Sequence, residues 1–324
     1  RIMAKKVTTI GVLTSGGDAP GMNAAIRSVV RVALHEGAEV WGIYNGYAGM
    51  LAGEMEQLTS RSVGDIIQRG GTFLGTARCE EFHTEAGQRK AIENVRQKGI
   101  EGLVVIGGNG SLTGAMKLAE MGLPVVGLPG SIDNDIWGTD YSIGFDTAIN
   151  TVVDAINKLR DTASAHRRVI VVEVMGRKSG WIAMTTGLAG GAEHILIPEM
   201  EYDLQDICKQ LVASRDSGKK YSIIVVAEGA GSAMEIGKVI AEETNFETRV
   251  SILGHIQRGG SPTAMDRLLA SALAEKAVLA LLQGLSNIMF GYRTGTICSV
   301  SLKDAVTCQK TIEPSLFRLS TVLS

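Results

Sequence analysis

The sequence has no apolar run long enough to cross a membrane as a helix, and its few cysteines lack the spacing of a metal site. A transmembrane helix needs roughly 20 consecutive apolar residues, and the apolar run that follows the basic start is too short for a signal sequence. The four cysteines, Cys79, Cys208, Cys298 and Cys308, form no CxxC motif. Unpaired cysteines are typical of a reducing compartment, so we expect a cytoplasmic protein with no membrane partner.

A strong excess of charge is also missing. The chain has 32 basic and 34 acidic side chains and a formal net charge of -2, which gives no reason to expect nucleic acid as a partner. Two phosphate-binding signatures are absent from its glycine-rich loops: the P-loop that ends in Gly-Lys-Ser/Thr, and GxGxxG. Any anion site must therefore be local and built from other elements.

Apolar, β-rich runs recur along the 324 residues, and they are continuous rather than alternating. Continuous runs predict strands that are buried on both faces, as in a parallel sheet covered by helices. The predicted strands are residues 8–14, 39–44, 103–106, 125–128, 169–174, 195–198 and 222–227. The predicted helices are residues 20–36, 84–98, 148–161, 203–217 and 263–282. The fold class is therefore α/β with mostly parallel sheets, and the chain length favours two domains.

Three glycine-rich loops follow predicted strands: LTSGGDAPGMN, VIGGNGS and LPGSIDND. In the first, Pro20 is expected near the first helical position, where its missing N–H does no harm. A tight strand-to-helix turn explains any one of these loops as well as phosphate binding does. Three loops at the carboxyl ends of parallel strands favour a ligand site, because ligands of open α/β sheets bind at that edge. The start of the helix after each loop favours an anion.

Ser131, Asp133 and Asp135 occupy alternate positions in the third loop. Alternate side chains of an extended segment point to one side, so we expect the hydroxyl and both carboxylates to face one cavity. Such a set suits phosphoryl transfer, in which one carboxylate accepts the proton of the attacking alcohol and another helps to hold magnesium. A solvated turn favours the same residue types, and the local pattern leaves both interpretations open.

Arginines gather in two later segments, AHRRVIVVEVMGRKSG and TRVSILGHIQRGGSP. The guanidinium group binds phosphate oxygens in a bidentate manner, so two clusters near strand ends predict a phosphorylated substrate beside the nucleotide. For any single arginine, a place on the solvated surface is the commoner explanation.

Six long motifs follow one another along the chain: SGGDAPGMNAAIR, RGGTFLGTAR, GGNGS, PGSIDNDIWGTDYSIGFDTA, VEVMGRKSGWIA and LGHIQRGGSPTAMDR. In this order they resemble the bacterial ATP-dependent 6-phosphofructokinases over almost the whole chain. The resemblance implies phosphorylation of fructose 6-phosphate by ATP at the 1-hydroxyl, in glycolysis, with Mg²⁺ as cofactor. It also implies a homotetramer whose subunits have two α/β domains with the active site between them. Residues 1–144 with 257–306 would bind ATP, and residues 145–256 with 307–324 the sugar phosphate.

The resemblance assigns roles to single residues as well. Asp133 matches the catalytic base, Ser131 a usual threonine, and Asp135 a second acid that arranges substrate and metal. Arg177 and Arg78 would stabilise charge on the transferring group. The implied ATP contacts are Gly17, Tyr47, Arg78, Gly108, Asn109, Gly110 and Ser111. The implied sugar-phosphate contacts are Ser131, Asp133, Asp135, Met175, Gly176, Arg177, Glu228, His255 and Arg258, with Arg168 and Arg249 from a neighbouring subunit.

An effector site is implied too, for ADP or phosphoenolpyruvate. Its matching positions are Arg27, Arg31, Asp65, Arg160, Glu193, Lys219 and Lys220. Ser60 and Ser217 stand where regulated members often carry basic residues, which counts against allosteric control. Cys79 stands where the family commonly has an aromatic residue near the adenine.

Asn109 is the most consequential departure from the family pattern. Its position is normally an aspartate that helps to place the magnesium on ATP. An amide keeps an oxygen ligand but removes a full negative charge beside a divalent ion. We hypothesise that Asn109 and Asp135 are the metal-binding residues and that Asn109 binds the metal more weakly than an aspartate would. The expected result is a reduced rate or a raised magnesium requirement.

Two other functions remain open from the sequence. A pyrophosphate-dependent relative typically carries an aspartate and a lysine at the positions of Gly110 and Gly130, and the glycines here leave that space to a nucleotide. A sensor that binds ligands without turnover is a second alternative, against which Asp133, Ser131 and both arginine clusters argue.

Overall fold

The computed structural model describes residues 7–323, and its contacts divide the chain into two compact units. Unit 1 contains the chain up to Ser131, residues 135–147 and residues 258–310. Unit 2 contains residues 132–134, residues 148–257 and the chain from Thr311 onwards. The predicted domain boundaries lie close to these divisions, and the functional names given to the domains stay predictions. The basic residues considered for a signal sequence, residues 1–6, lie outside the described residues.

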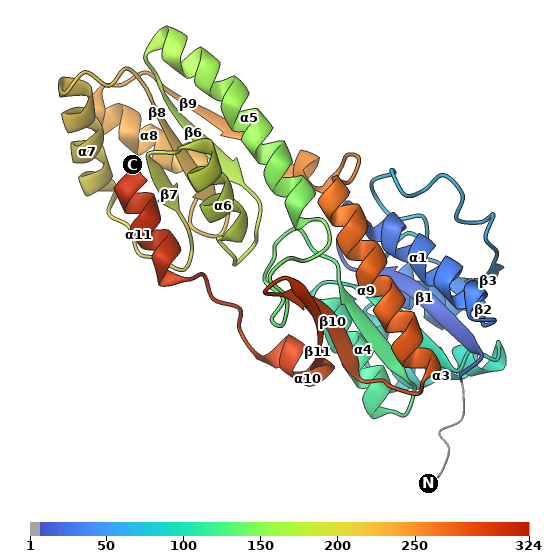
Figure 1. Ribbon diagram of the computed structural model, residues 1–324. Coiled ribbons are helices and arrows are strands. Elements are labelled where there is room, and N and C mark those ends of the chain that lie inside the picture. The colour runs from blue at the N-terminus through green and yellow to red at the C-terminus, as the bar shows by residue number, and fades with distance from the viewer. Residues whose placement is uncertain (1–6, 324) are drawn as a thin grey trace. The chain divides into compact units, whose positions relative to one another are not determined.

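Unit 1 is built on a seven-stranded sheet with the order β11-β10-β5-β4-β1-β2-β3 (Figure 1). The five inner strands are parallel, and the edge strands β3 and β11 run antiparallel to their neighbours. The strands are β1 (Thr9–Ser15), β2 (Glu39–Ile43), β3 (Met55–Leu58), β4 (Gly102–Gly107), β5 (Val125–Pro129), β10 (Ile288–Arg293) and β11 (Thr296–Ser301). β4 and β5 are buried along their whole length, which explains their continuous apolar sequences.

Helices cover both faces of this sheet (Figure 1). α1 packs against α9, while α2 packs against α3 and α4 against α10. The helices are α1 (Met22–His35), α2 (Gly46–Ala52), α3 (Glu85–Gln97), α4 (Asn109–Glu120), α9 (Ala264–Leu282) and α10 (Leu302–Thr307), with a short 3₁₀ helix η1 (Glu81–His83). The apolar residues between the sheet, α2, α3, α4 and α10 form one continuous core cluster.

Unit 2 contains a fully parallel four-stranded sheet with the order β7-β8-β6-β9. Its strands are β6 (Val169–Val174), β7 (His194–Leu196), β8 (Ser222–Ala227) and β9 (Thr248–Ile252). Its helices are α5 (Phe145–His166), α6 (Trp181–Gly190), α7 (Leu204–Asp216), α8 (Ala233–Thr244) and α11 (Pro314–Leu323), with the 3₁₀ helix η2 (Gly254–Arg258). α7 packs against α8, and α11 packs against α6. α5 begins in unit 1 and continues in unit 2 after Thr147.

Side-chain caps fix several helix starts within a residue of the predicted ones. Thr84 Oγ1 accepts a hydrogen bond from Gly87 N at the start of α3, and Thr263 Oγ1 accepts one from Asp266 N at the start of α9. α1 begins later than predicted. Its N-cap is Gly21 with φ of 108°, and a Cβ there would lie 2.7 Å from the Ile143 side chain. Pro20 therefore lies before the N-cap and not at the first helical position.

Two findings concern membrane-spanning helices and the cysteines. No helix within residues 7–323 has the length and apolarity to span a membrane. Cys79, Cys208, Cys298 and Cys308 are all free thiols.

Candidate active site

Three loops begin at the carboxyl edge of three neighbouring strands of the unit 1 sheet. β5, β4 and β1 are adjacent and parallel, and they end at Pro129, Gly107 and Ser15. The segments that follow are the three predicted glycine-rich loops, so the prediction that they share one edge is confirmed. Ligands of open α/β sheets bind at this edge.

The glycines of the loop after β4 serve different purposes. A Cβ on Gly107 would lie 2.5 Å from Ser15 O and 2.6 Å from Ser111 Cβ, so Gly107 allows β1 and α4 to approach β4 closely. A Cβ on Gly110 would meet no described atom within 4 Å, and one on Gly108 would meet nothing nearer than 3.8 Å. Gly107 is therefore a packing glycine, while Gly108 and Gly110 leave room in front of the loop.

The first turn of α4 borders the open space at Gly108 and Gly110. Asn109 is its first residue, and in the described part of the chain no side chain caps its backbone N–H groups. Uncapped amides and the positive end of the helix dipole favour an anion such as a phosphate. Asn109 Nδ2 donates a hydrogen bond of 2.9 Å to Asp135 Oδ2, so the Asn109 amide is turned toward the second predicted acid.

Tyr47, a predicted ATP contact, is part of the core behind this loop. Its side chain is 6% exposed, and its ring stacks on Phe82 with 3.9 Å between ring centroids. The Tyr47 hydroxyl donates a 2.5 Å hydrogen bond to Ser111 O in the first turn of α4. Burial raises the pKa of Tyr47 well above its usual value, so this hydroxyl stays a donor. Tyr47 thus supports the loop from behind, and a direct contact with ATP stays a prediction.

Gly17 and Arg258 are brought together although they are far apart in the sequence. A Cβ on Gly17 would lie 1.7 Å from Arg258 Nη1, so the guanidinium packs directly on this glycine. Arg258 Nε is buried and has no hydrogen-bond partner among the described residues. Guanidinium donors beside the first glycine-rich loop are suited to phosphate oxygens. The structure therefore places Arg258, predicted as a sugar-phosphate contact, against the loop predicted to contact ATP.

The segment with Ser131, Asp133 and Asp135 is not extended, so the extended conformation from which the alternation was argued is wrong, and a shared cavity for the three side chains stays a prediction. Residues 132 and 133 form a turn, and Asn134 is left-handed with φ of 51°. Asparagine tolerates that conformation better than most residues. As a result, Asp133 is grouped with unit 2, while Ser131 and Asp135 are grouped with unit 1.

Asp133 lies in unit 2 beside the loop that follows β6. Its side chain is buried, and Arg177 Nε lies 4.0 Å from Asp133 Oδ2. Ser179 Oγ donates a 3.2 Å hydrogen bond to Asp133 O. The Arg177 side chain is 71% exposed. A buried carboxylate beside an exposed cation is suited to accept a proton next to a developing negative charge.

Three more predicted sugar-phosphate contacts meet at the carboxyl edge of the unit 2 sheet. Met175 follows β6, Glu228 follows β8 and His255 lies in η2 after β9, and these strands are neighbours. Glu228 Oε1 accepts hydrogen bonds from Gly176 N (3.1 Å) and Arg177 N (2.7 Å). Glu228 therefore holds the backbone of the loop that carries Arg177.

Arg168 and Arg249 lie at the opposite edge of the same sheet. Arg168 precedes β6, Arg249 is near the amino end of β9, and each Nη2 lies 2.7 Å from Glu247 Oε1. The hydrogen bond from Arg168 is the main cause that lowers the pKa of Glu247. A strand rises about 3.3 Å per residue, so neither arginine contacts a ligand at the carboxyl edge of its own sheet.

The effector-site matches of unit 2 form a group of their own. Lys219 Nζ lies 3.1 Å from Glu193 Oε1, and both line a hollow of about 280 Å³ with His194. Burial lowers the pKa of His194. Arg160 donates to Gly190 O and Gly191 O near this group, while Lys220 follows Lys219 in the chain. The remaining matches, Arg27, Arg31 and Asp65, belong to unit 1.

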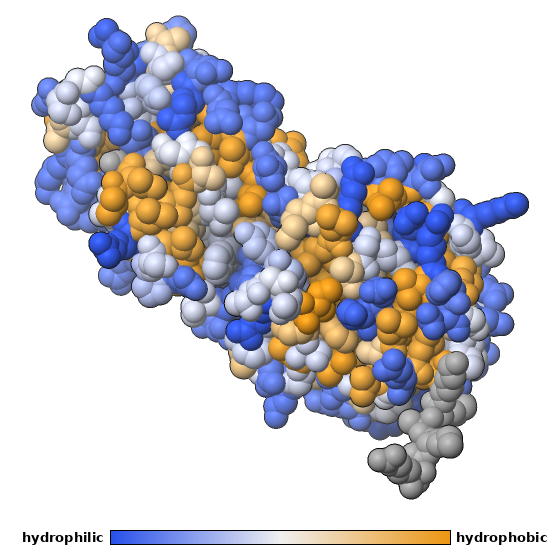
Figure 2. All heavy atoms as spheres, viewed as in Figure 1, coloured by the Kyte–Doolittle hydropathy of each residue, from blue (hydrophilic) through white to orange (hydrophobic). Residues whose placement is uncertain are grey.

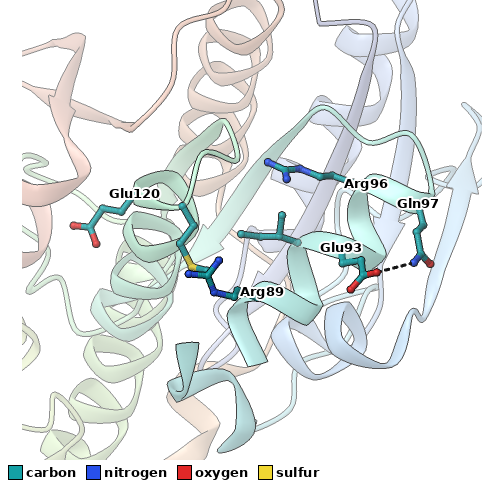
Figure 3. Close-up of a pocket in the computed structure, with 7 residues that line it drawn as sticks. Arg89, Glu93, Arg96, Gln97 and Glu120 are labelled. Carbon is teal, nitrogen blue, oxygen red and sulfur yellow. Dashed lines mark hydrogen bonds between the residues drawn. The ribbon is translucent and has the colours of Figure 1, made fainter. Parts of the chain in front are cut away.

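A larger hollow, of about 660 Å³, lies elsewhere in unit 1 (Figure 3). Arg89, Glu93, Arg96 and Gln97 line it from α3, and Glu120 lines it from α4. Its lining contains none of the predicted site residues. Its charges are mixed and in part already paired, since Arg89 contacts Glu85 and Gln97 donates to Glu93. This hollow offers no defined charge to a ligand.

Comparison with known proteins decides the family. The family model described as phosphofructokinase matches residues 9–281 of this chain. The chain belongs to the phosphofructokinase family. A Bacillus velezensis protein named ATP-dependent 6-phosphofructokinase is 59% identical over 315 residues, which cover 97% of this chain and 99% of that protein. The Bacillus subtilis (strain 168) protein of the same name is 58% identical over the same length.

Solved structures of the family have the same fold. Phosphofructokinase from Saccharomyces cerevisiae aligns with a TM-score of 0.88 and 36% identity over 98% of this chain, which spans 48% of the yeast chain. A pyrophosphate-dependent phosphofructokinase from Marinobacter aquaeolei aligns with a TM-score of 0.86 at 23% identity, over 95% of this chain and 86% of that one. The second likeness shows the fold alone.

Lys310 is a residue near the predicted site that sequence reasoning missed. Its ammonium donates a 2.9 Å hydrogen bond to Asp140 O, 170 residues earlier in the chain. Burial lowers the pKa of Lys310 to about 7, although the carboxylates of Asp140 and Asp135 raise it. No local motif marks Lys310, because its burial depends on a distant segment.

Proposed function

We propose that this chain transfers the γ-phosphoryl group of ATP to the 1-hydroxyl of fructose 6-phosphate, giving fructose 1,6-bisphosphate and ADP in glycolysis. One observation carries the proposal: the 59% identity that extends over nearly all of this chain and of a relative named for that activity. The loop motifs at the carboxyl edges of both sheets support it. A cytoplasmic location fits a glycolytic reaction.

The base in this proposal is Asp133. The attacking 1-hydroxyl gives its proton to the Asp133 carboxylate as its oxygen forms a bond to the γ-phosphorus, and the bond from phosphorus to the leaving oxygen of ADP breaks. Arg177, whose Nε lies 4.0 Å from Asp133 Oδ2, is placed to stabilise charge on the transferring group. Ser179 holds the backbone of Asp133 through its hydroxyl.

The nucleotide phosphates would be held in unit 1. The uncapped amides at the start of α4 suit a phosphate, and the room in front of Gly108 and Gly110 admits one. Arg258 adds a guanidinium at Gly17, and the exposed Arg78 is the second arginine that we assign to the transferring group. These groups bind and orient, which is most of what phosphoryl transfer requires of a protein.

Magnesium fits the residues that are present. The described residues contain no group of three or more His, Cys, Asp or Glu side chains arranged for a metal. Mg²⁺ does not need such a cage, because it commonly takes one or two carboxylates together with substrate phosphates and water. Asp135 would hold it together with the amide oxygen of Asn109, whose Nδ2 donates a 2.9 Å hydrogen bond to Asp135 Oδ2. Bound there with ATP, the ion would neutralise charge on the phosphates.

Release of ADP from ATP, dependent on fructose 6-phosphate and measured during a magnesium titration, tests the proposed function. Pyrophosphate is run in parallel as the alternative donor. Turnover with ATP that rises with magnesium is expected, because Gly110 leaves the nucleotide's space open. Turnover with pyrophosphate alone would identify a pyrophosphate-dependent enzyme. Binding of both ligands without turnover at saturating magnesium would identify a sensor.

Asn109→Asp tests the proposed metal side of the site. The variant places a second carboxylate beside Asp135, where the ion relieves their repulsion and gains a charged ligand. We expect the half-saturating magnesium concentration to fall about 10-fold, equal to about 1.4 kcal/mol. Calorimetry of Mg²⁺ binding to the enzyme with a non-hydrolysable ATP analogue gives the same shift without turnover.

The control for this variant is Asn245→Asp, an exposed asparagine that ends α8. It adds the same charge away from the site and should leave the magnesium dependence unchanged. An unchanged magnesium dependence in Asn109→Asp as well would remove the idea that Asn109 alters metal handling.

An oligomer and an effector site complete the proposal. Because Arg168 and Arg249 lie at the opposite edge from Met175, Glu228 and His255, a second copy of the chain must supply them if they bind the sugar phosphate, as in a homotetramer. Figure 2 shows hydrophobic atoms at the surface around α11, where Leu319, Val322 and Leu323 are exposed.

The group around Glu193 and Lys219 would take part in binding ADP or phosphoenolpyruvate.

A further inference from the structure

Gln257 is a buried polar residue that neither the motifs nor the reaction has assigned a role. It lies in η2, between His255 and Arg258, and its side chain is 0% exposed. A glutamine in such a place needs partners for its amide, because burying an unpaired polar group is costly. Its partners identify what it does.

The Gln257 amide joins two adjacent strand ends of unit 2. Oε1 accepts a 3.2 Å hydrogen bond from Met175 N, directly after β6. Nε2 donates a 3.0 Å hydrogen bond to the O of Gly254, two residues after the end of β9. The regular pairing of these strands ends at Glu173 with Ile252, and Leu253 N still donates to Glu173 O. Gln257 therefore continues the connection between the strands beyond the point where their backbones separate.

The loop that Gln257 holds has an unfavourable backbone. Arg177 is left-handed with φ of 55°, and Gly176 has φ of 141°. Such conformations persist where surrounding contacts hold them, and they cluster at functional sites. Here the three consecutive N–H groups of Met175, Gly176 and Arg177 donate to two side chains, the first to Gln257 and the other two to Glu228.

We propose that Gln257 is a positioning residue for the sugar-phosphate substrate, which fixes the loop of residues 175–177 relative to the η2 turn that carries His255. The inference rests on the proposed function. Glu228 fixes the same loop from β8, so the loop is held from both sides of β6. Loss of either hydrogen bond of Gln257 separates groups that must contact one substrate together.

Gln257→Met and Gln257→Glu test this role. Methionine keeps the buried length and removes both hydrogen bonds, whereas an ionised glutamate still accepts from Met175 N but has no donor for Gly254 O. We expect the KM for fructose 6-phosphate to rise about 10- to 100-fold in each variant. The KM for ATP should stay within about twofold of the wild type, because the ATP-binding loops belong to unit 1. Gln283→Met, at the exposed end of α9, is the matched control.

Calorimetric binding of fructose 6-phosphate and thermal unfolding accompany the kinetics. A weaker affinity with a cooperative unfolding transition supports positioning. A folded variant with an unchanged KM for fructose 6-phosphate, or with equal rises in both KM values, overturns it. If the wild type neither binds nor phosphorylates fructose 6-phosphate, the proposed function fails as well. If the wild type is active and the variants are unaffected, only the role of Gln257 is removed. If Gln257→Met does not fold, Gln257→Glu decides between these outcomes, because it only replaces the side-chain NH₂ group by an oxygen.

Discussion

Replacing Asp133 with asparagine is expected to lower kcat with ATP and fructose 6-phosphate by about 10²–10⁴-fold, the usual contribution of a general base. The amide has the same shape as the carboxylate but does not accept the proton of the 1-hydroxyl. Asp133 is buried, and its backbone is held by Ser179, so the substitution should leave the segment in place. Steady-state kinetics at saturating magnesium measure the loss.

Two further measurements separate a lost base from a lost site. Fructose 6-phosphate should still bind to Asp133→Asn in calorimetry, with an affinity within about 10-fold of the wild type, because most of its contacts remain. Asp206→Asn is the control: Asp206 is exposed in the first turn of α7 and belongs to none of the predicted sites. If kcat of Asp133→Asn stays within about twofold of the wild type, another group is the base.

The sheet and its ligand edge were accessible from the sequence because their signals are local. β6 and β8 have the predicted bounds, and β4 extends the prediction by one residue at each end. Strands buried on both faces must be apolar throughout, so their positions can be read without knowing their neighbours. The carboxyl ends of parallel strands then fall on one edge, which places the three glycine-rich loops together.

Details that depend on distant partners were not accessible. Whether a glycine admits a ligand or a neighbour depends on what packs there: Gly17 faces Arg258, whereas Gly110 faces open space. α6 is apolar all round, so it gives no helical stripe, and the hairpin of β10 and β11 was not predicted. The left-handed Asn134, which turns the chain between Asp133 and Asp135, has no signal in a segment that also reads as extended. Family resemblance supplied the residue roles, and local chemistry alone left them open.

Asp266 carries the second large effect, on stability. It is fully buried in the first turn of α9, and its carboxylate binds the start of another helix, α5. Oδ1 accepts from Gly144 N, while Oδ2 accepts from Thr147 N and from Thr147 Oγ1, at 2.6–2.8 Å. Thr263 N donates to the same Thr147 Oγ1. One carboxylate thus satisfies donors at the beginning of α5 and ties them to the cap of α9.

Asp266→Ala should lower the free energy of unfolding by about 3–5 kcal/mol, because it leaves several buried donors without an acceptor. Urea unfolding followed by circular dichroism, at one protein concentration, measures the loss. Asp206→Ala, in the first turn of α7 where the carboxylate is 61% exposed, should change stability by less than about 0.5 kcal/mol. A loss below about 1 kcal/mol in Asp266→Ala would mean that water replaces the carboxylate.

The same carboxylate predicts how stability depends on pH. Burial raises the pKa of Asp266 from 3.8 to about 6, against the lowering effect of its hydrogen bonds from Thr147 and Gly144. Between these two values the folded chain keeps a proton that the unfolded chain has released, so the contribution of Asp266 to stability falls as the pH rises from about 4 to about 6 and is constant above. Asp266→Asn cannot titrate. As the pH rises from about 4 to about 6, the wild type loses this stability and the variant does not. The free energy of unfolding of Asp266→Asn minus that of the wild type should therefore increase by about 1–3 kcal/mol, since one pKa unit corresponds to about 1.4 kcal/mol. A constant difference between the two proteins from pH 4 to pH 7 would show that the three donors, and not burial, determine the ionisation of this aspartate.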